Sequence, residues 1–301
     1  MGCPQVGAKI RARTAKAASA GLLIAVFAAG CGSAETEQPE STEIIAFADG
    51  DGSIYTIEPD GSGLRQLTAT ITDDHTAYAS YPDVSPDGTR IAFTRGSTIA
   101  VMNVDGTDQK VIAERGGQPA FSPDGSEIVF GCVGGICIVN ADGSNRRQLS
   151  PENDGSGAIS RSDPTFTPDG TKIVFNESGY IAGFDTDGNG WFQILRDQYW
   201  NSDPAYSPDG STIVFSSNRG PTDNSETYTM TADGQDIRPL TTEFAVHATF
   251  SPDGSKIVYT RGITGPRSGA QIWVMNADGS EPRQLTSSSL MAQSPSWGGH
   301  S

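Results

Sequence analysis

Motifs that mark common enzyme classes are missing from this chain of 301 residues. It contains no G-x-S-x-G, H-E-x-x-H or G-x-x-x-x-G-K-[ST] motif, and no G-x-G-x-x-G that opens a helix. Its only histidines are His75, His247 and His300, so acid–base catalysis by histidine has few candidates. We therefore expect no enzymatic activity and assign no catalytic residue.

Basic residues are also scarce. The chain carries 20 Lys and Arg against 36 Asp and Glu, a formal net charge of −16. Residues 1–30 hold 4 of the 20 bases and no acid, so the remainder has 16 bases against 36 acids, or −20. A surface of this charge repels phosphate backbones, which argues against nucleic acid as a partner.

Long hydrophobic runs are absent as well. The apolar stretch 17–29 is shorter than the roughly 20 residues of a transmembrane helix, and it follows a basic segment, as in an export signal. It ends in Ala28-Ala29-Gly30-Cys31, which resembles a bacterial lipobox, although Leu is usual in place of Ala28. We therefore predict a lipoprotein signal peptide over 1–30, lipidation of Cys31, a flexible tether over 31–42, and a location on the outer face of the cytoplasmic membrane or in the periplasm. The alternative is an ordinary signal peptide with Cys31 unmodified.

Cysteine is rare, and the sequence GCVGGIC holds the two cysteines outside the N-terminal segment. If Gly134-Gly135 form a two-residue hairpin turn, Cys132 and Cys137 face each other with Cα atoms at about 4.5 Å, within reach of a disulfide. Export permits such a bond. A zinc site is the weaker alternative, because no histidine or second cysteine pair is nearby in the sequence.

Glycine and proline, in contrast, are abundant, with 36 Gly and 18 Pro, and they belong to a repeat. Five units contain a Ser/Thr-Pro-Asp-Gly turn, a short apolar run, a variable loop, a further apolar run and a second Asp-Gly turn. They begin at Tyr81, Gln118, Asp163, Asp203 and His247. Ser-Pro-Asp-Gly matches a type I turn at every position. Four antiparallel strands in about 40 residues are typical of one propeller blade.

The two ends of the repeat region determine the number of blades. Residues 43–68 supply a second, third and fourth strand without a first, and residues 293–297 align with a first strand. Together they complete a sixth blade, which removes the exposed sheet edges. The sequence therefore predicts an all-β fold over 43–301, a six-bladed β-propeller of four-stranded antiparallel blades closed by pairing of the terminal strands.

The repeat units resemble the WD40-like Asp/Gly repeats of TolB-type propellers over 43–301. That resemblance implies the propeller fold and a binding or scaffolding role. TolB-type proteins carry an α/β domain ahead of the propeller, whereas a leader and a short tether stand there in this chain, so we do not transfer a Pal-type partner. The catalytic domain of prolyl-oligopeptidase-type enzymes, which use related propellers, is absent from this sequence.

The loops of the two faces differ. The uniform Asp-Gly turns share one face, and the loops of variable length share the other, which we call the variable face. Function usually lies on variable loops held by a rigid scaffold. The variable loops contain four residues suited to a protein or peptide contact, His75, Tyr78, Tyr199 and Trp200. Packing of Tyr199 and Trp200 between blades is the alternative.

One further set of residues precedes the Pro-x-[Phe/Tyr] segment of each first strand, or aligns with it. Because first strands line the channel of a propeller, we expect these residues to encircle its mouth on the variable face and to form a binding site. The six residues, which we call the mouth ring, are Ser294, Tyr81, Gln118, Asp163, Asp203 and His247. We predict no metal or cofactor. The alternative is a divalent cation held by Asp163, Asp203 and His247.

The leading functional hypothesis is a monomeric cell-envelope lipoprotein whose propeller binds or scaffolds a protein or peptide and reaches the membrane through its lipid. One alternative is a metal-dependent hydrolase or lactonase that uses the channel mouth, by analogy of fold only. Another is a propeller that binds cell-wall carbohydrate on Trp200 and Tyr199.

Overall fold

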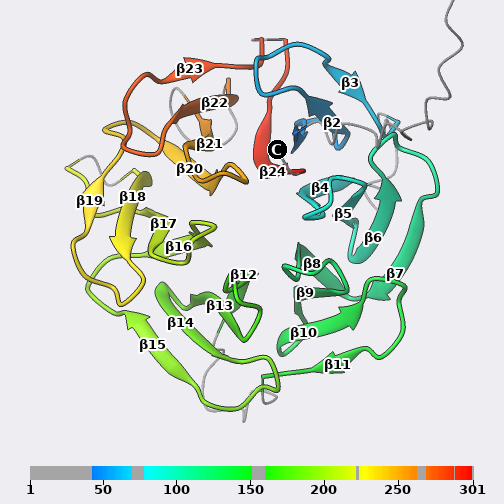
Figure 1. The fold of residues 1–301 in the computed structure, drawn as a ribbon, viewed down its shortest axis with the longest axis horizontal. Helices are drawn as coiled ribbons and strands as arrows, with labels where there is room; N and C mark the ends of the chain where they lie inside the picture. The colour runs from blue at the N-terminus through cyan, green and yellow to red at the C-terminus, as the bar shows by residue number, and fades with distance from the viewer. Residues whose placement is uncertain are drawn as a thin grey trace, which may run out of the picture. The chain divides into compact units, whose positions relative to one another are not determined.

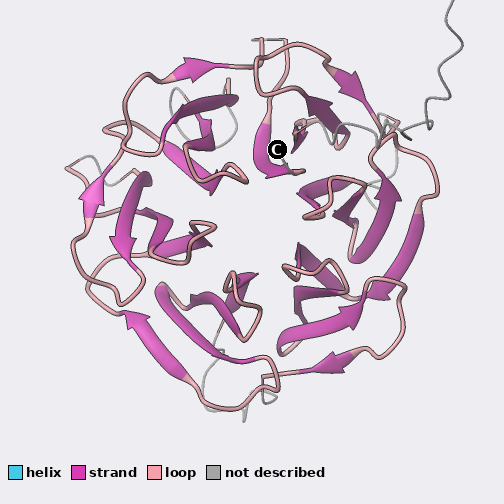
Figure 2. Cartoon of the chain, viewed as in Figure 1, coloured by secondary structure: helices cyan, strands magenta, loops and turns pink. Residues whose placement is uncertain are grey.

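The computed structural model describes residues 43–69, 78–150, 160–221, 224–262, 269–287 and 289–299. They form 24 strands in six sheets of four, arranged as a ring around a central axis (Figure 1). The predicted all-β six-bladed propeller is confirmed, and strands joined by loops make up the whole described ring (Figure 2). Within these ranges no helix is long and apolar enough to cross a membrane.

The strands follow the predicted order within each blade, from the channel outward. The innermost strands are β24 (Gln293–Gly298), β4 (Ala79–Val84), β8 (Gly116–Phe121), β12 (Arg161–Phe166), β16 (Asn201–Tyr206) and β20 (Ala245–Phe250). The second strands are β1 (Ile44–Ala48), β5 (Arg90–Arg95), β9 (Glu127–Cys132), β13 (Lys172–Glu177), β17 (Thr212–Ser217) and β21 (Lys256–Arg261).

The two outer positions of each blade complete the sheets. The third strands are β2 (Ile54–Ile57), β6 (Thr98–Asn103), β10 (Gly135–Asn140), β14 (Tyr180–Asp185), β18 (Glu226–Thr231) and β22 (Gln271–Asn276). The fourth strands lie on the rim (Figure 1) and are β3 (Arg65–Gln66), β7 (Lys110–Glu114), β11 (Arg147–Gln148), β15 (Phe192–Leu195), β19 (Arg238–Pro239) and β23 (Arg283–Gln284). Rim strands as short as two residues present little edge for pairing with another chain.

The hydrophobic core lies between the blades. The second strand of each blade places one aromatic ring there, at most 1% exposed, and the six rings are Phe47, Phe93, Phe130, Phe175, Phe215 and Tyr259. Each apolar cluster joins neighbouring sheets, as where Val174 of β13 packs with Phe215 of β17. Strands buried on both faces explain why the apolar runs are continuous instead of alternating.

Pairing of the chain ends closes the ring. β24 is hydrogen-bonded antiparallel to β1, with Ile44 opposite Gly298 and Ile45 opposite Trp297. The resulting sheet has the order β24-β1-β2-β3. The predicted combination of one C-terminal and three N-terminal strands is therefore confirmed.

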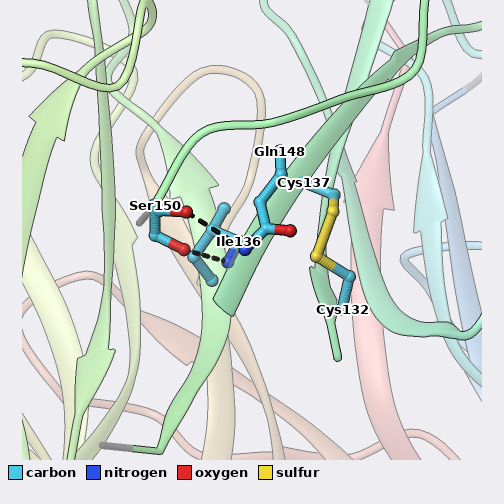
Figure 3. The surroundings of a disulfide bond; sticks show 5 residues. All are labelled: Cys132, Ile136, Cys137, Gln148 and Ser150. Atoms are coloured by element: carbon cyan, nitrogen blue, oxygen red, sulfur yellow. Dashed lines mark hydrogen bonds between the residues drawn. A yellow bond between two sulfur atoms is a disulfide. The ribbon is translucent and has the colours of Figure 1, made fainter. Parts of the chain in front are cut away.

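A disulfide joins Cys132 and Cys137, whose Cα atoms lie 5.8 Å apart (Figure 3). The predicted register of this hairpin is wrong, because Cys132 pairs with Gly135, so Val133 and Gly134 form the turn. The two cysteines are diagonal neighbours on one face of the sheet instead of direct opposites. Gly134 occupies the second central position of the observed turn, which requires a positive φ, and its φ is 91°. The turn therefore lies one residue closer to the N-terminus than the predicted Gly134-Gly135 turn.

The Ser/Thr-Pro-Asp-Gly turns are held by their aspartates. Asp124 Oδ1 accepts hydrogen bonds from Ser122 Oγ at 2.6 Å, from the Ser126 backbone N–H at 3.0 Å and from Ser126 Oγ at 2.8 Å. These bonds stabilise the ionised carboxylate and lower the pKa of Asp124 to about 2. The same acceptor pattern occurs at Asp87, Asp169, Asp209 and Asp253.

We predict that Asp124→Asn destabilises the protein at neutral pH but much less in acid. A carboxyl with a lowered folded pKa contributes stability above its unfolded pKa of about 4, and this contribution is lost as the pH falls toward the folded value of about 2. Calorimetry from pH 7 to pH 2 should show a Tm deficit of about 2 °C at pH 7 that shrinks below pH 4. Glu114→Gln, at an exposed residue of β7, is the control. A deficit that is constant across this range would contradict the prediction.

Candidate functional site: the channel mouth

A β-bulge near the start of every innermost strand builds the site. In β4, Tyr81 and Pro82 lie between the pairs Ser80–Thr94 and Asp83–Ala92, so two residues oppose one. A bulge re-aims the side chain of its extra residue. Proline suits this position because it has no N–H to give to the ladder. All six members of the mouth ring have φ between 49° and 57°. Recurrence in every blade indicates that the fold imposes this conformation.

The mouth ring lines a single pocket. Its volume is about 150 Å³, and all six predicted residues contribute to its wall together with the residues that follow them in their strands. Ser294 comes from β24, so the ring is complete only because the terminal strands pair. The structure thus brings together all the residues predicted at the channel mouth, while their binding role stays a prediction.

Gln118 and Asp163 form the most connected pair of the ring. Gln118 Nε2 donates to Asp163 Oδ1, the Asp163 backbone N–H donates to Gln118 Oε1 at 3.3 Å, and Ser162 Oγ donates to Asp163 Oδ2 at 2.9 Å. Burial raises the pKa of Asp163 to about 7, and the negative charge of Asp203 acts in the same direction. Asp163 therefore exchanges a proton near neutral pH.

Asp203, His247 and Tyr81 form the other side of the ring. Asp203 Oδ2 accepts from Ser202 Oγ at 3.1 Å, and His247 Nε2 lies 3.7 Å from Asp203 Oδ1. The rings of Tyr81 and His247 meet edge to face with centroids 5.8 Å apart. His247 Nδ1 is buried and has no hydrogen-bond partner among the described residues. Burial, with the charges of Asp163 and Asp203, raises the pKa of Tyr81 to about 12, so its hydroxyl stays protonated.

Sequence reasoning missed Asp83, which lies in the wall of the same pocket. It joins three blades, because its oxygens accept from the Phe121 backbone N–H at 2.7 Å and from Ser296 Oγ at 2.9 Å. Burial raises its pKa to about 6, against these two hydrogen bonds. The other five blades carry only small uncharged residues at this register, Ser296, Ala120, Thr165, Ala205 and Thr249. A charged residue in only one of the six blades at this position could have identified Asp83 from the sequence.

Asp163, Asp203 and His247, the ligands of the alternative divalent-cation site, share the pocket. Across the described ranges, no three or more His, Cys, Asp or Glu side chains form a group that could hold a metal ion. The metal content of the pocket stays a prediction.

The loop aromatics have different environments. Tyr78 donates its hydroxyl hydrogen to the Gly50 carbonyl at 3.1 Å, and Tyr199 lies beside the Arg219 guanidinium, 5.4 Å from the centroid of its ring. Trp200 lies against Gly179 and is 54% exposed. His75 and the lipidation candidate Cys31 fall outside the described residues.

Three exposed apolar side chains share the variable face. Val133, in the β9–β10 turn, is 76% exposed, Trp200, between β15 and β16, is 54% exposed, and Met291, between β23 and β24, is 45% exposed. By topology these connections lie at the end of the channel where the innermost strands begin. They belong to three different sectors around the mouth (Figure 1).

The molecule is thus a six-bladed propeller with a carboxylate-containing pocket at one end of its channel. Residues 180–300 match the family model of the TolB beta propeller domain. Among solved structures, TolB from Acinetobacter baumannii aligns with a TM-score of 0.70 at 19% identity, covering 86% of this chain and 67% of that one. These matches confirm the predicted resemblance to the TolB-type propellers.

Two further structures share the fold. Putative TolB from Agrobacterium tumefaciens aligns with a TM-score of 0.65 at 18% identity and covers 82% of this chain and 89% of that one. An oligogalacturonate lyase in complex with manganese aligns with a TM-score of 0.51 at 19% identity, covering 83% and 74%. A search of curated protein sequences finds no match. At these identities the structural matches establish the fold alone.

We predict that Asp163→Asn weakens the pH dependence of stability near neutrality. A carboxyl whose folded pKa is raised to about 7 adds stability as the pH falls from about 7 toward its unfolded pKa of about 4, because the folded state then binds the extra proton. The Tm of the wild type should therefore rise between pH 8 and pH 5 by several degrees more than that of the variant. Parallel profiles of the two proteins would refute the assignment. Glu114→Gln again serves as the control.

Proposed function

We propose that the protein is an exported, monomeric lipoprotein of the cell envelope whose propeller binds a protein or peptide partner through its variable face. The main support is that three of the six large apolar side chains exposed among the described residues, Val133, Trp200 and Met291, lie on the face that also holds the pocket. Partly exposed tryptophan is a frequent centre of protein interfaces.

The opposite face supports this choice by contrast. Its turn aspartates already accept hydrogen bonds from neighbouring serines and threonines of the same turn, as Asp124 and Asp209 do. Polar groups satisfied internally gain little from a partner. On the variable face, in contrast, Asp203 Oδ1 accepts no hydrogen bond from any described residue.

The first test compares two tryptophans of nearly equal exposure, one on the variable face and one on the rim. Trp200, 54% exposed, lies on the variable face, and Trp191, 55% exposed, lies immediately before the rim strand β15. In crosslinking and affinity capture from the cell envelope, Trp200→Ala should lower recovery of the partner at least about tenfold, and Trp191→Ala should leave it unchanged. Equal losses in both variants, or no loss in either, would contradict the proposed binding face.

The membrane anchor is tested separately. Cys31→Ser should move the protein from the membrane fraction to the soluble fraction, because the single thiol that would carry lipid is gone while the propeller is untouched. Export itself should persist, which is measured by protease accessibility in intact and permeabilised cells. A variant that stays with the membrane would indicate a different attachment.

An enzyme is the second candidate, and it rests on a likeness of fold to an oligogalacturonate lyase in complex with manganese. Metal-dependent turnover requires a bound ion, so stoichiometric manganese, calcium or zinc in the purified protein, removable by EDTA with loss of binding or activity, would favour it. Retention of partner binding in EDTA would favour the binding module.

A further inference from the structure

The pocket at the channel mouth holds acidic groups. Its wall contains Asp83, Asp163 and Asp203, and no described lysine or arginine lines it. Two partly buried carboxylates elsewhere in the ring have arginine partners, since Glu177 has Arg161 at 2.9 Å and Asp197 has Arg219 at 2.9 Å. A carboxylate withdrawn from water is costly unless it is paired. Among the described residues, the carboxylates of the channel mouth lack the arginine counter-charge that Glu177 and Asp197 have.

One carboxylate oxygen in the pocket also accepts no hydrogen bond from the described residues. Asp203 Oδ2 accepts from Ser202, whereas Asp203 Oδ1 accepts no hydrogen bond from any described residue and has His247 Nε2 at 3.7 Å. Asp163, in contrast, is engaged by Gln118 and Ser162. A cationic donor that enters beside Asp203 would therefore meet a free acceptor.

We propose that this pocket binds the cationic end of a lysine or arginine side chain that the protein partner inserts into the channel mouth. The inference rests on the proposed function and specifies its chemistry. At about 150 Å³ the pocket is smaller than the 300–1,000 Å³ of typical small-molecule sites, so it suits the end of a side chain. The ring of Tyr81 supplies an aromatic wall, which favours a cation.

Binding of this cation is coupled to protons. A positive charge beside Asp163 favours its ionised form and lowers its pKa from about 7. The other side chains with an ionisable group in this pocket are Asp203, His247, Tyr81 and Asp83. Binding is therefore accompanied by release of protons near pH 7.

The binding test uses three small probes and the full chain. N-acetyl-lysine amide and N-acetyl-arginine amide carry the cation, and N-acetyl-norleucine amide has a similar length without charge. NMR titration of the His247 ring signal should give saturable shifts with the two cationic probes, at least tenfold tighter than with norleucine. Asp163→Asn/Asp203→Asn should abolish this preference, and Asp124→Asn on the opposite face should keep it. Equal affinity for norleucine, or no saturable shift, overturns the proposal, as does saturable binding of calcium or manganese that the lysine probe cannot displace.

A second measurement does not depend on variants. Because Asp163 becomes protonated below pH 7, the affinity of the wild type for the lysine probe should fall severalfold between pH 8 and pH 5.5, and a constant affinity overturns the proposal.

Partner capture separates this inference from the proposed function. If Trp200→Ala impairs capture and the double variant does not, the partner binds the face without inserting a cation, and only the inference fails. If the lysine probe binds while Trp200→Ala leaves capture unchanged, the pocket stands and the proposed docking face fails.

Discussion

Pairing of β24 with β1 is the contact on which the ring and its site depend. It joins residues about 250 positions apart in the chain, with Ile45 opposite Trp297. The same strand adds Ser294 to the mouth ring and brings Ser296 within hydrogen-bonding distance of Asp83. Closure therefore leaves no long unpaired strand edge in the ring and completes the pocket in one step. A change in β24 therefore affects both the closure of the ring and the pocket at the channel mouth.

The bulge of the innermost strands converts this closed ring into a site. A regular strand would alternate its side chains between the two faces of each blade, where they would join the inter-blade core. The extra residue of the bulge instead lines the channel pocket, as Gln118 does between Gly117 and Pro119. Because the bulge is repeated six times, substitutions at its extra residue change the chemistry of the mouth without changing the fold.

The repeat made the fold and the membership of the mouth ring predictable, because turn and strand residues recur at fixed spacing. The hairpin at Cys132 was predicted one residue out of register, since two adjacent glycines allow two turns and local sequence does not choose between them. Asp83 was missed because its importance depends on contacts with Phe121 and Ser296 in two other blades. The pattern within one repeat carries no information about hydrogen-bond partners in other blades, whereas comparison of the six blades at this position singles out Asp83.

The acidic composition itself has two physical origins. Turn aspartates such as Asp124 are held ionised by short hydrogen bonds from neighbouring serines, so their pKa values fall and their charge is part of the architecture. In the channel, burial raises the pKa values of Asp163 and Asp83, and no lysine or arginine of the described residues lines the pocket. Aspartate therefore stabilises the turns on one face, whereas at the channel mouth its carboxylates have no lysine or arginine partner among the described residues. The net charge of −16 does not distinguish turn aspartates from channel aspartates. The direction of the pKa shift does distinguish them, and the raised values lie at the mouth of the channel.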